Sequence, residues 1–358
     1  PRRGEFRCQP GLAKPLGRGR PRRYCAAMAA IFVVTFPFFA VVLLGYVAAA
    51  RQVMPETAIP GLSTFVLFFA LPCMLFRFGA SRPIAQLIDP GLIAIYTACA
   101  LLMVLCCIAL SLRREPAGPG VGLKDAAFGA LVATFPNAGF MGVPLLVGLL
   151  GEPAAGPLIG ALLVDLVLTS SLCLAIAQIA PNEAGRQNDS LIAALGRALR
   201  GAASNPLPWA FALGAAVEAT SLVLPEPLIQ IVKMLADAAT PVALFTIGAV
   251  LWRARRHSTN ATPLSGYLPL ALVKLLVHPL LILSVGVIAS AVGIAVSPFG
   301  LLVLVLTAAL PSASNVSILA ERYGADNGRV TRIIMASTVL AFLSFSLFAW
   351  GLGADVRR

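Results

Sequence analysis

The stretch TFPNAGFMGVP, from Thr134 to Pro144, decides how this sequence is interpreted. It lies inside a long apolar run, yet it contains two prolines, two glycines and an asparagine. Proline removes a backbone donor and clashes with the preceding helical turn, and glycine adds backbone freedom. The stretch therefore predicts a break in a helix that would otherwise be continuous.

The composition around this break is typical of a polytopic membrane protein. Of 358 residues, 59% are hydrophobic and 12% are charged, and the mean hydropathy is +0.89. A soluble domain is about a quarter charged. The net charge of +12 lies largely in loops between apolar runs, where basic residues set topology, so it does not indicate nucleic acid.

Apolar runs of about 20 residues, the length that crosses a bilayer as a helix, recur along the chain. We therefore expect an all-α fold with ten transmembrane helices. They are expected at 29–50, 59–78, 91–112, 127–150, 155–180, 206–223, 228–252, 265–291, 298–321 and 330–353. The domains are then a first five-helix unit (29–180), a cytoplasmic linker (181–205), a second five-helix unit (206–353) and a short tail (354–358).

The linker contains SLIAALGRALRGA, in which apolar residues recur at helical spacing beside two arginines. This pattern predicts a short amphipathic helix. It favours a helix lying on the membrane surface and an ordinary linker helix equally well. The residues concerned are Leu191, Ile192, Leu195, Leu199, Arg197 and Arg200.

The two units share a weak internal repeat. LPCMLFRFGA at 71–80 matches TPVALFTIGA at 240–249, with Pro72 and Pro241 separated by 169 positions. The same offset pairs Pro37 with Pro206, Leu44 with Leu213 and Gly45 with Gly214, and FPNAG faces LPSASN at a slightly larger offset. Since each unit has an odd number of spans, the repeats are expected to be inverted, as in many secondary transporters.

The loop charges predict an orientation. Loops after odd-numbered spans carry thirteen Lys or Arg residues, Arg329 among them, whereas loops after even-numbered spans carry three. By the positive-inside rule the first set is cytoplasmic and both termini face outward. The basic segment 1–28 conflicts with this assignment, so we expect a non-native or disordered extension before a natural start at Met28.

Two breaks at equivalent places of inverted repeats indicate a substrate site near the membrane midplane, because freed backbone groups need burial or a wet cavity. Half-helix N-termini carry partial positive charge and favour an anion. The other interpretation is a pair of kinks that only shape helix packing. Candidate binding residues are Pro136, Asn137, Gly139, Pro311, Ser312, Ser314 and Asn315.

Three ionisable residues lie within apolar spans, where such residues are rare and mostly functional. Asp165 has Thr169 one turn away, and it is a candidate for proton coupling or for an assembly contact inside the bundle. Lys274 and His278 are four residues apart and share one helix face. Lys274 is a candidate coupling residue or an interfacial lysine, and His278 a candidate proton relay or a structural residue.

Six motifs in this order resemble the auxin efflux carrier family, which includes plant PIN-formed transporters and many bacterial carriers. They are PFFAVVLLGY, LPCMLF, FPNAGFMGVPLL, NPLPWAFALG, TPVALFTIGAVL and LPSASNVSILAERYG. The resemblance implies two inverted five-helix repeats, broken fourth and ninth helices that cross at their prolines, and elevator-like transport of organic anions. It places Pro136, Asn137, Pro311 and Asn315 at the crossover, and the short central loop is similar to that of bacterial members.

We therefore expect a secondary active or facilitative carrier of a small mono- or dicarboxylate such as malonate in a bacterial plasma membrane. No cofactor or metal is expected, although the sequence allows coupling to H⁺ or Na⁺. The expected partners are the organic anion and membrane lipid, and the sequence also allows a homodimer. Rival interpretations are a sodium-coupled symporter or cation/proton antiporter of a related crossover fold, and an anion sensor that does not transport. No nucleophile–base or metal constellation indicates an enzyme.

Overall fold

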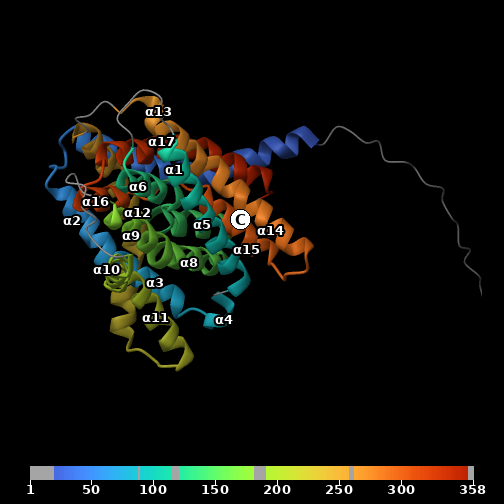
Figure 1. The fold of residues 1–358 in the computed structure, drawn as a ribbon. Coiled ribbons are helices and arrows are strands. Elements are labelled where there is room, and N and C mark those ends of the chain that lie inside the picture. Colours follow the sequence, from blue (N-terminus) through green and yellow to red (C-terminus); the bar gives the residue numbers. More distant parts are fainter. Residues whose placement is uncertain (1–19, 88, 114–120, 181–190, 258–261, 354–358) are drawn as a thin grey trace, which may run out of the picture.

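A computed structural model of the chain describes residues 20–87, 89–113, 121–180, 191–257 and 262–353, and shows helices packed into one bundle (Figure 1). Within these residues every named element is a helix, and the only β-type pairing is a single isolated bridge. Seven helical stretches are long and apolar enough to cross a membrane. The chain is therefore an all-helical, multi-pass membrane protein.

Helices lie along the expected segments, but only seven stretches of the described chain, not ten, have the length and apolar composition of a membrane span, and several segments consist of shorter pieces. In chain order they are α1 (Arg20–Ala50), α2 (Ala58–Phe65), η1 (Val66–Ala70), α3 (Leu71–Gly79), α4 (Ile84–Leu87), α5 (Pro90–Leu112), α6 (Leu123–Thr134), η2 (Ala138–Gly142), α7 (Val143–Leu150), η3 (Glu152–Ala154), α8 (Ala155–Val164), η4 (Asp165–Thr169), α9 (Ser170–Ile179), α10 (Leu191–Ala203), α11 (Pro206–Ala219), α12 (Glu226–His257), α13 (Leu264–Leu272), η5 (Val273–Val277), α14 (His278–Ala291), α15 (Pro298–Ala308), α16 (Asn315–Arg322) and α17 (Asn327–Gly351).

Three helices begin at a polar residue followed by proline. Asp89 accepts hydrogen bonds from the N–H groups of Gly91 and Leu92 at the start of α5. Asn205 and Ser297 cap α11 and α15 in the same way. These side chains satisfy donors that a helix start leaves free, and proline at the first helical position lacks the N–H that would need a partner. The sequence therefore fixes where these spans begin.

The two expected breaks lie where the prolines are. α6 ends at Thr134, and Phe135 is extended, with φ −79° and ψ 103°. A residue before proline is pushed out of the helical region, which explains this conformation. The helix resumes at Ala138, and the second break separates Ala308, the end of α15, from Asn315, the start of α16.

Two pairs of helices cross with their backbones in contact. A methyl group added to Gly45 of α1 would lie 1.9 Å from the carbonyl oxygen of Phe245 in α12. A methyl group on Gly214 of α11 would lie 2.1 Å from the carbonyl oxygen of Phe76 in α3. Gly45 and Gly214 differ by 169 positions, and so do Phe76 and Phe245. Both crossings therefore use the same pairs of positions in the sequence repeat.

The partner helix at each of these crossings also contributes a glycine to the contact. A methyl group on Gly248 of α12 would lie 1.8 Å from the carbonyl oxygen of Val42 in α1. A methyl group on Gly79 of α3 would lie 2.4 Å from that of Phe211 in α11. These residues again follow the offset of 169. Small residues allow such close approach between membrane helices.

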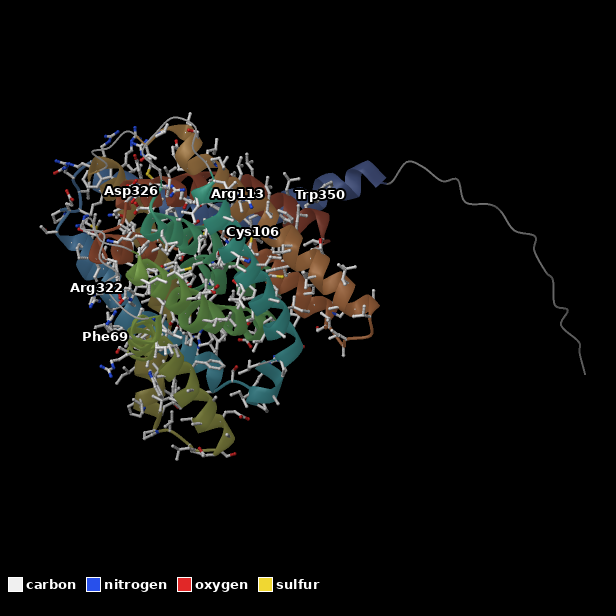
Figure 2. All side chains as sticks on the ribbon, viewed as in Figure 1. Phe69, Cys106, Arg113, Arg322, Asp326 and Trp350 are labelled. Atoms are coloured by element: carbon white, nitrogen blue, oxygen red, sulfur yellow. The ribbon has the colours of Figure 1, made fainter. Side chains whose placement is uncertain are left out.

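The charge count included Arg329 among loop residues, but the structure buries it at the start of α17. Its guanidinium donates to the Gly266 carbonyl at 3.0 Å and to the Ser111 hydroxyl at 3.3 Å. Figure 2 shows Arg113, next to the end of α5, and Asp326, which caps α17, on the same side of the molecule. Arg329 thus joins helix ends on this side and contributes less to the loop charge than the count assumed.

Some expected segments extend past the described residues. Residues 1–19 and 354–358 lie outside them, as do residues 181–190 of the linker. α1 begins at Arg20, so the last part of the basic segment continues the first helix. The predicted amphipathic helix of the linker is α10.

Large apolar side chains lie on the periphery of the bundle, as Phe69 does in Figure 2 with 53% of its surface exposed.

Candidate functional site

The two breaks meet at an antiparallel bridge between Pro136 and Ser312. The N–H of Asn137 donates to the carbonyl oxygen of Pro311 at 2.8 Å, and the N–H of Ala313 donates to that of Phe135 at 3.0 Å. The broken helices therefore cross and bond directly to one another. Pro136 lies opposite Ser312, one residue beyond the proline-to-proline crossing that the family resemblance implied.

The crossing leaves backbone donors free at two helix starts. Within the described residues, no hydrogen bond is found from the N–H groups of Gly139 and Phe140, at the start of η2, or of Ser314 and Asn315, at the start of α16. Free N–H groups at a helix N-terminus favour a negative charge. Both half-helices therefore present backbone N–H groups without a partner among the described residues at the breaks.

Polar side chains accumulate at the same place. Asn137 is buried, and its side chain makes no capping hydrogen bond to η2. The hydroxyls of Thr134 and Ser312 are buried without a partner among the described residues. Ser314 is buried and Asn315 half-buried at the start of α16. Buried polar atoms in proteins are nearly always paired, so these hydroxyls indicate that the breaks receive a polar ligand or water.

The two glycines after the first break have different surroundings. A methyl group on Gly142 would lie 2.7 Å from a Leu310 methyl group across the crossing, so a larger residue there would force the Leu310 side chain to move. A methyl group on Gly139 would reach only ordinary contact with Leu71, at 3.7 Å. Close packing therefore explains Gly142, whereas Gly139 has room for a larger side chain.

Asp165 is fully buried and is held by two hydroxyl donors. The Tyr96 hydroxyl of α5 donates to Oδ2 at 2.6 Å, and the Thr169 hydroxyl donates to Oδ1 at 3.0 Å. Asp165 begins the π-helical turn η4, and such turns are common at functional sites. The expected proximity of Thr169 is confirmed, and Tyr96 is an additional partner.

Lys274 is buried in the π-helical turn η5, so it is not an interfacial lysine. Its Nζ donates to the carbonyl oxygen of Ala308 at 2.8 Å and lies 3.3 Å from Nδ1 of His278. Ala308 is the last residue of α15 before the second break. A helix end leaves its last carbonyl groups without partners, and the Lys274 amine satisfies one of them at the end of this half-helix.

The charged residues form one buried cluster between the two halves of the chain. The rings of Tyr96 and His278 lie 6.0 Å apart between centroids, which links the Asp165 pair to the Lys274 pair. No ion pair within 4.0 Å joins Asp165 to Lys274 in the described chain. We call Tyr96, Asp165, Lys274 and His278 the charged cluster.

The sequence did not single out three residues that complete these sites. Tyr96 and Ala308 belong to the charged cluster or contact it. Ser337 of α17 accepts the N–H of Ser312 at 3.1 Å and so supports the second break. An aromatic, an alanine and a serine in apolar spans carry no sequence signal that distinguishes them from packing residues. No group of metal-ligating side chains is found within the described residues.

Comparison with known proteins identifies relatives along nearly the whole chain. Residues 30–349 match the family described as "Membrane transport protein". A protein of Rhizobium meliloti (strain 1021) named "Putative malonate transporter" is 31% identical over 316 residues, covering 88% of this chain and 93% of the relative.

Two further relatives are named only as transporters. An "Uncharacterized transporter" of Methanothermobacter thermautotrophicus is 28% identical, covering 86% of this chain and 94% of the relative. "Uncharacterized transporter YfdV" of Escherichia coli (strain K12) is 26% identical, covering 87% of this chain and 93% of the relative. These names bear on the class of activity, and one of them on the class of substrate.

Proposed function

The chain belongs to the membrane transport protein family, and on this basis we propose that it carries a small organic anion, a mono- or dicarboxylate such as malonate. That it is a membrane transporter rather than an enzyme follows from the family and from the names of its relatives. The name of the Rhizobium meliloti relative supports an organic anion as the substrate.

The observation that carries the proposal is the pair of helix starts at the crossing. Four backbone N–H groups there have no hydrogen-bond partner among the described residues, and they come from both halves of the chain. A carboxylate has two oxygens that accept such bonds, and Asn137 and Asn315 add side-chain amide donors. The anion would therefore be held by Pro136, Asn137 and Gly139 on one side and by Pro311, Ser312, Ser314 and Asn315 on the other.

We propose that the chain consists of ten membrane-spanning helices in two inverted repeats, with the fourth and ninth spans broken at the crossing. The shared offset of 169 at both glycine crossings supports this arrangement. The residues at the crossing are nearly all buried, so the substrate reaches them only after a movement of the protein. Alternating access by an elevator-like motion provides that movement, with access from one face at a time.

The proposed location is the plasma membrane of a bacterium, with lipid around the bundle and both termini outside. The exposed apolar side chains of the long helices support contact with lipid. The two rival functions differ in measurable ways. Sodium-coupled symport would require a Na⁺ gradient for uptake, whereas a sensor would bind the anion without moving it.

Counterflow in proteoliposomes tests the proposal. Purified protein is reconstituted with malonate inside, and the entry of labelled malonate from outside is followed with and without a Na⁺ gradient. We expect unlabelled malonate inside the liposomes to accelerate the entry of labelled malonate. We expect this exchange to occur without a Na⁺ gradient. Binding of malonate in a thermal-shift assay without any counterflow would support the sensor instead.

A further inference from the structure

A cavity of about 410 Å³ opens at one end of the bundle, away from the crossing. Its walls come from the α3–α5 connection, from η3 and the start of α8, and from the start of α15. Three charged residues, Arg82, Asp89 and Glu152, lie around it together with the hydroxyls of Ser81 and Ser297. Such a polar lining indicates that the cavity contains water.

A second, narrow space between α5, α8 and α15 adjoins this cavity. The two share Leu87, Asp89, Leu92 and Pro157 as lining residues. The narrow space measures about 10 Å³. That is about the volume accessible to one water molecule.

The three helices around the narrow space lead to the charged cluster. Leu92 of α5, Ala161 of α8 and Leu304 of α15 line it. Four residues further along the same helices are Tyr96, Asp165 and Ala308. A helical turn advances about 5.4 Å, so the carboxylate and its neighbours lie about one turn beyond the narrow space on all three helices.

Asp165 is the group at the end of this route that can take up a proton. Its two oxygens each accept one hydroxyl hydrogen bond, which leaves further lone pairs. The titratable groups around the cluster come from the neighbouring helices. They are Tyr96, Cys99 and Cys107 on α5, Cys173 on α9, and Lys274 and His278 on η5 and α14.

We propose that the cavity and the narrow space form a water route for protons to Asp165, separate from the site where the anion binds. A proton leaves water in the cavity, passes through the narrow space and forms an O–H bond on a carboxylate oxygen of Asp165. It is released to the other side when the carrier changes conformation. This inference rests on the proposed function for its role in transport, since it makes the carrier proton-coupled.

The route itself is tested without any substrate. Infrared spectra of reconstituted protein are recorded through a pH titration and after transfer to D₂O. We expect a carboxylic-acid C=O band that Asp165→Asn removes. Gly61 of α2 lines neither space, and an added methyl group there meets no atom within 4 Å, so Gly61→Leu is the matched control.

Gly160→Leu fills the narrow space. It should slow the D₂O shift of the Asp165 band about tenfold relative to Gly61→Leu, which corresponds to about 1.4 kcal/mol on the barrier. Equal exchange rates in the two variants would overturn the route. Absence of a band that depends on Asp165 would overturn Asp165 as the proton acceptor. Neither result depends on transport.

The role in transport is tested with a pH-sensitive dye inside malonate-transporting proteoliposomes. The ratio of luminal acidification to malonate uptake should fall to the protein-free background in Asp165→Asn, because no carboxylate remains there to carry the proton. An unchanged ratio would refute coupling through Asp165. If malonate does not move but the infrared results hold, the proposed function fails and the water route stands.

Discussion

The N–H of Asn137 and the carbonyl oxygen of Pro311 are joined by a 2.8 Å hydrogen bond between two breaks that are far apart in the sequence. Proline cannot donate a backbone hydrogen bond, and the residue before it is forced to be extended. Each break therefore contains a short non-helical segment, and the two segments pair with each other. The bond holds the two half-helix starts close together, as the proposed anion site requires.

Removing either asparagine side chain at the crossing should weaken transport. Asn137→Ala and Asn315→Ala are each expected to lower malonate uptake about tenfold or more, because a hydrogen bond to a charged group contributes roughly 1.5–3 kcal/mol. Initial rates in proteoliposomes measure the effect. Asn327→Ala, at the start of α17, is the matched control and should transport normally. Normal uptake by both crossing variants would show that the anion binds elsewhere.

The glycine crossings should be equally intolerant of a methyl group. Gly248→Ala and Gly79→Ala bring a carbon to 1.8 Å and 2.4 Å from backbone oxygens, so the helices must separate. Overpacking of this kind costs about 1–3 kcal/mol. Thermal unfolding in detergent should show a lower midpoint for both variants. Gly61→Ala in α2 meets no atom within 4 Å and should not lower the midpoint. If the midpoint of Gly248→Ala were also not lowered, the close crossing would be contradicted.

Tyr96→Phe should destabilise the protein through Asp165. The substitution deletes a 2.6 Å hydrogen bond to a buried carboxylate, and losing such a partner costs roughly 1.5–3 kcal/mol. In Asp165→Asn the same substitution should cost less, because the partner is then uncharged. A double-mutant cycle of unfolding midpoints measures this coupling. Tyr323→Phe, which retains the ring packed against Phe128, serves as the control, and additive effects of Tyr96→Phe and Asp165→Asn would exclude the coupling.

The linker helix α10 should lie at the lipid surface. Ile192 is 84% exposed, whereas Ala194 is fully buried, and Leu199 is exposed beside Arg200. An apolar exposed face with flanking arginines is typical of an interfacial helix. A spin label at Ile192→Cys in liposomes should collide more with dissolved oxygen than with a polar nickel reagent. The reverse preference, or the same behaviour as a label at Arg200→Cys, would favour a simple linker.

The helical fold was predictable because its signals are local. Long apolar runs fix the spans, and proline fixes both breaks and three helix starts. The π-helical turns were not predictable. Asp165 begins one and Lys274 lies in another, yet neither sequence differs visibly from an ordinary apolar helix. A π-turn adds one residue to a turn, and tertiary packing rather than composition determines where it forms.

The candidate site was predictable only in part. Asn137, Ser312 and Asp165 were identified because polar groups are costly in an apolar span, whatever their neighbours. Tyr96 was missed because burial of an aromatic ring is favourable, so a tyrosine in an apolar span does not stand out. Only its 2.6 Å hydrogen bond to Asp165 reveals a role. Ala308 contributes a carbonyl oxygen, which every residue has. Sequence patterns identify side chains, whereas backbone ligands become visible only in the structure.

The glycine crossings also bear on the origin of the chain. Each crossing joins one half of the chain to the other, through the same pair of positions used twice. In the proposed inverted-repeat arrangement, two separate copies of a five-helix ancestor, inserted in opposite directions, would have met through this same surface. Fusion of the two genes would have needed only a connection such as residues 181–190. The two halves, expressed as separate polypeptides, should therefore find each other in the membrane and restore the carrier.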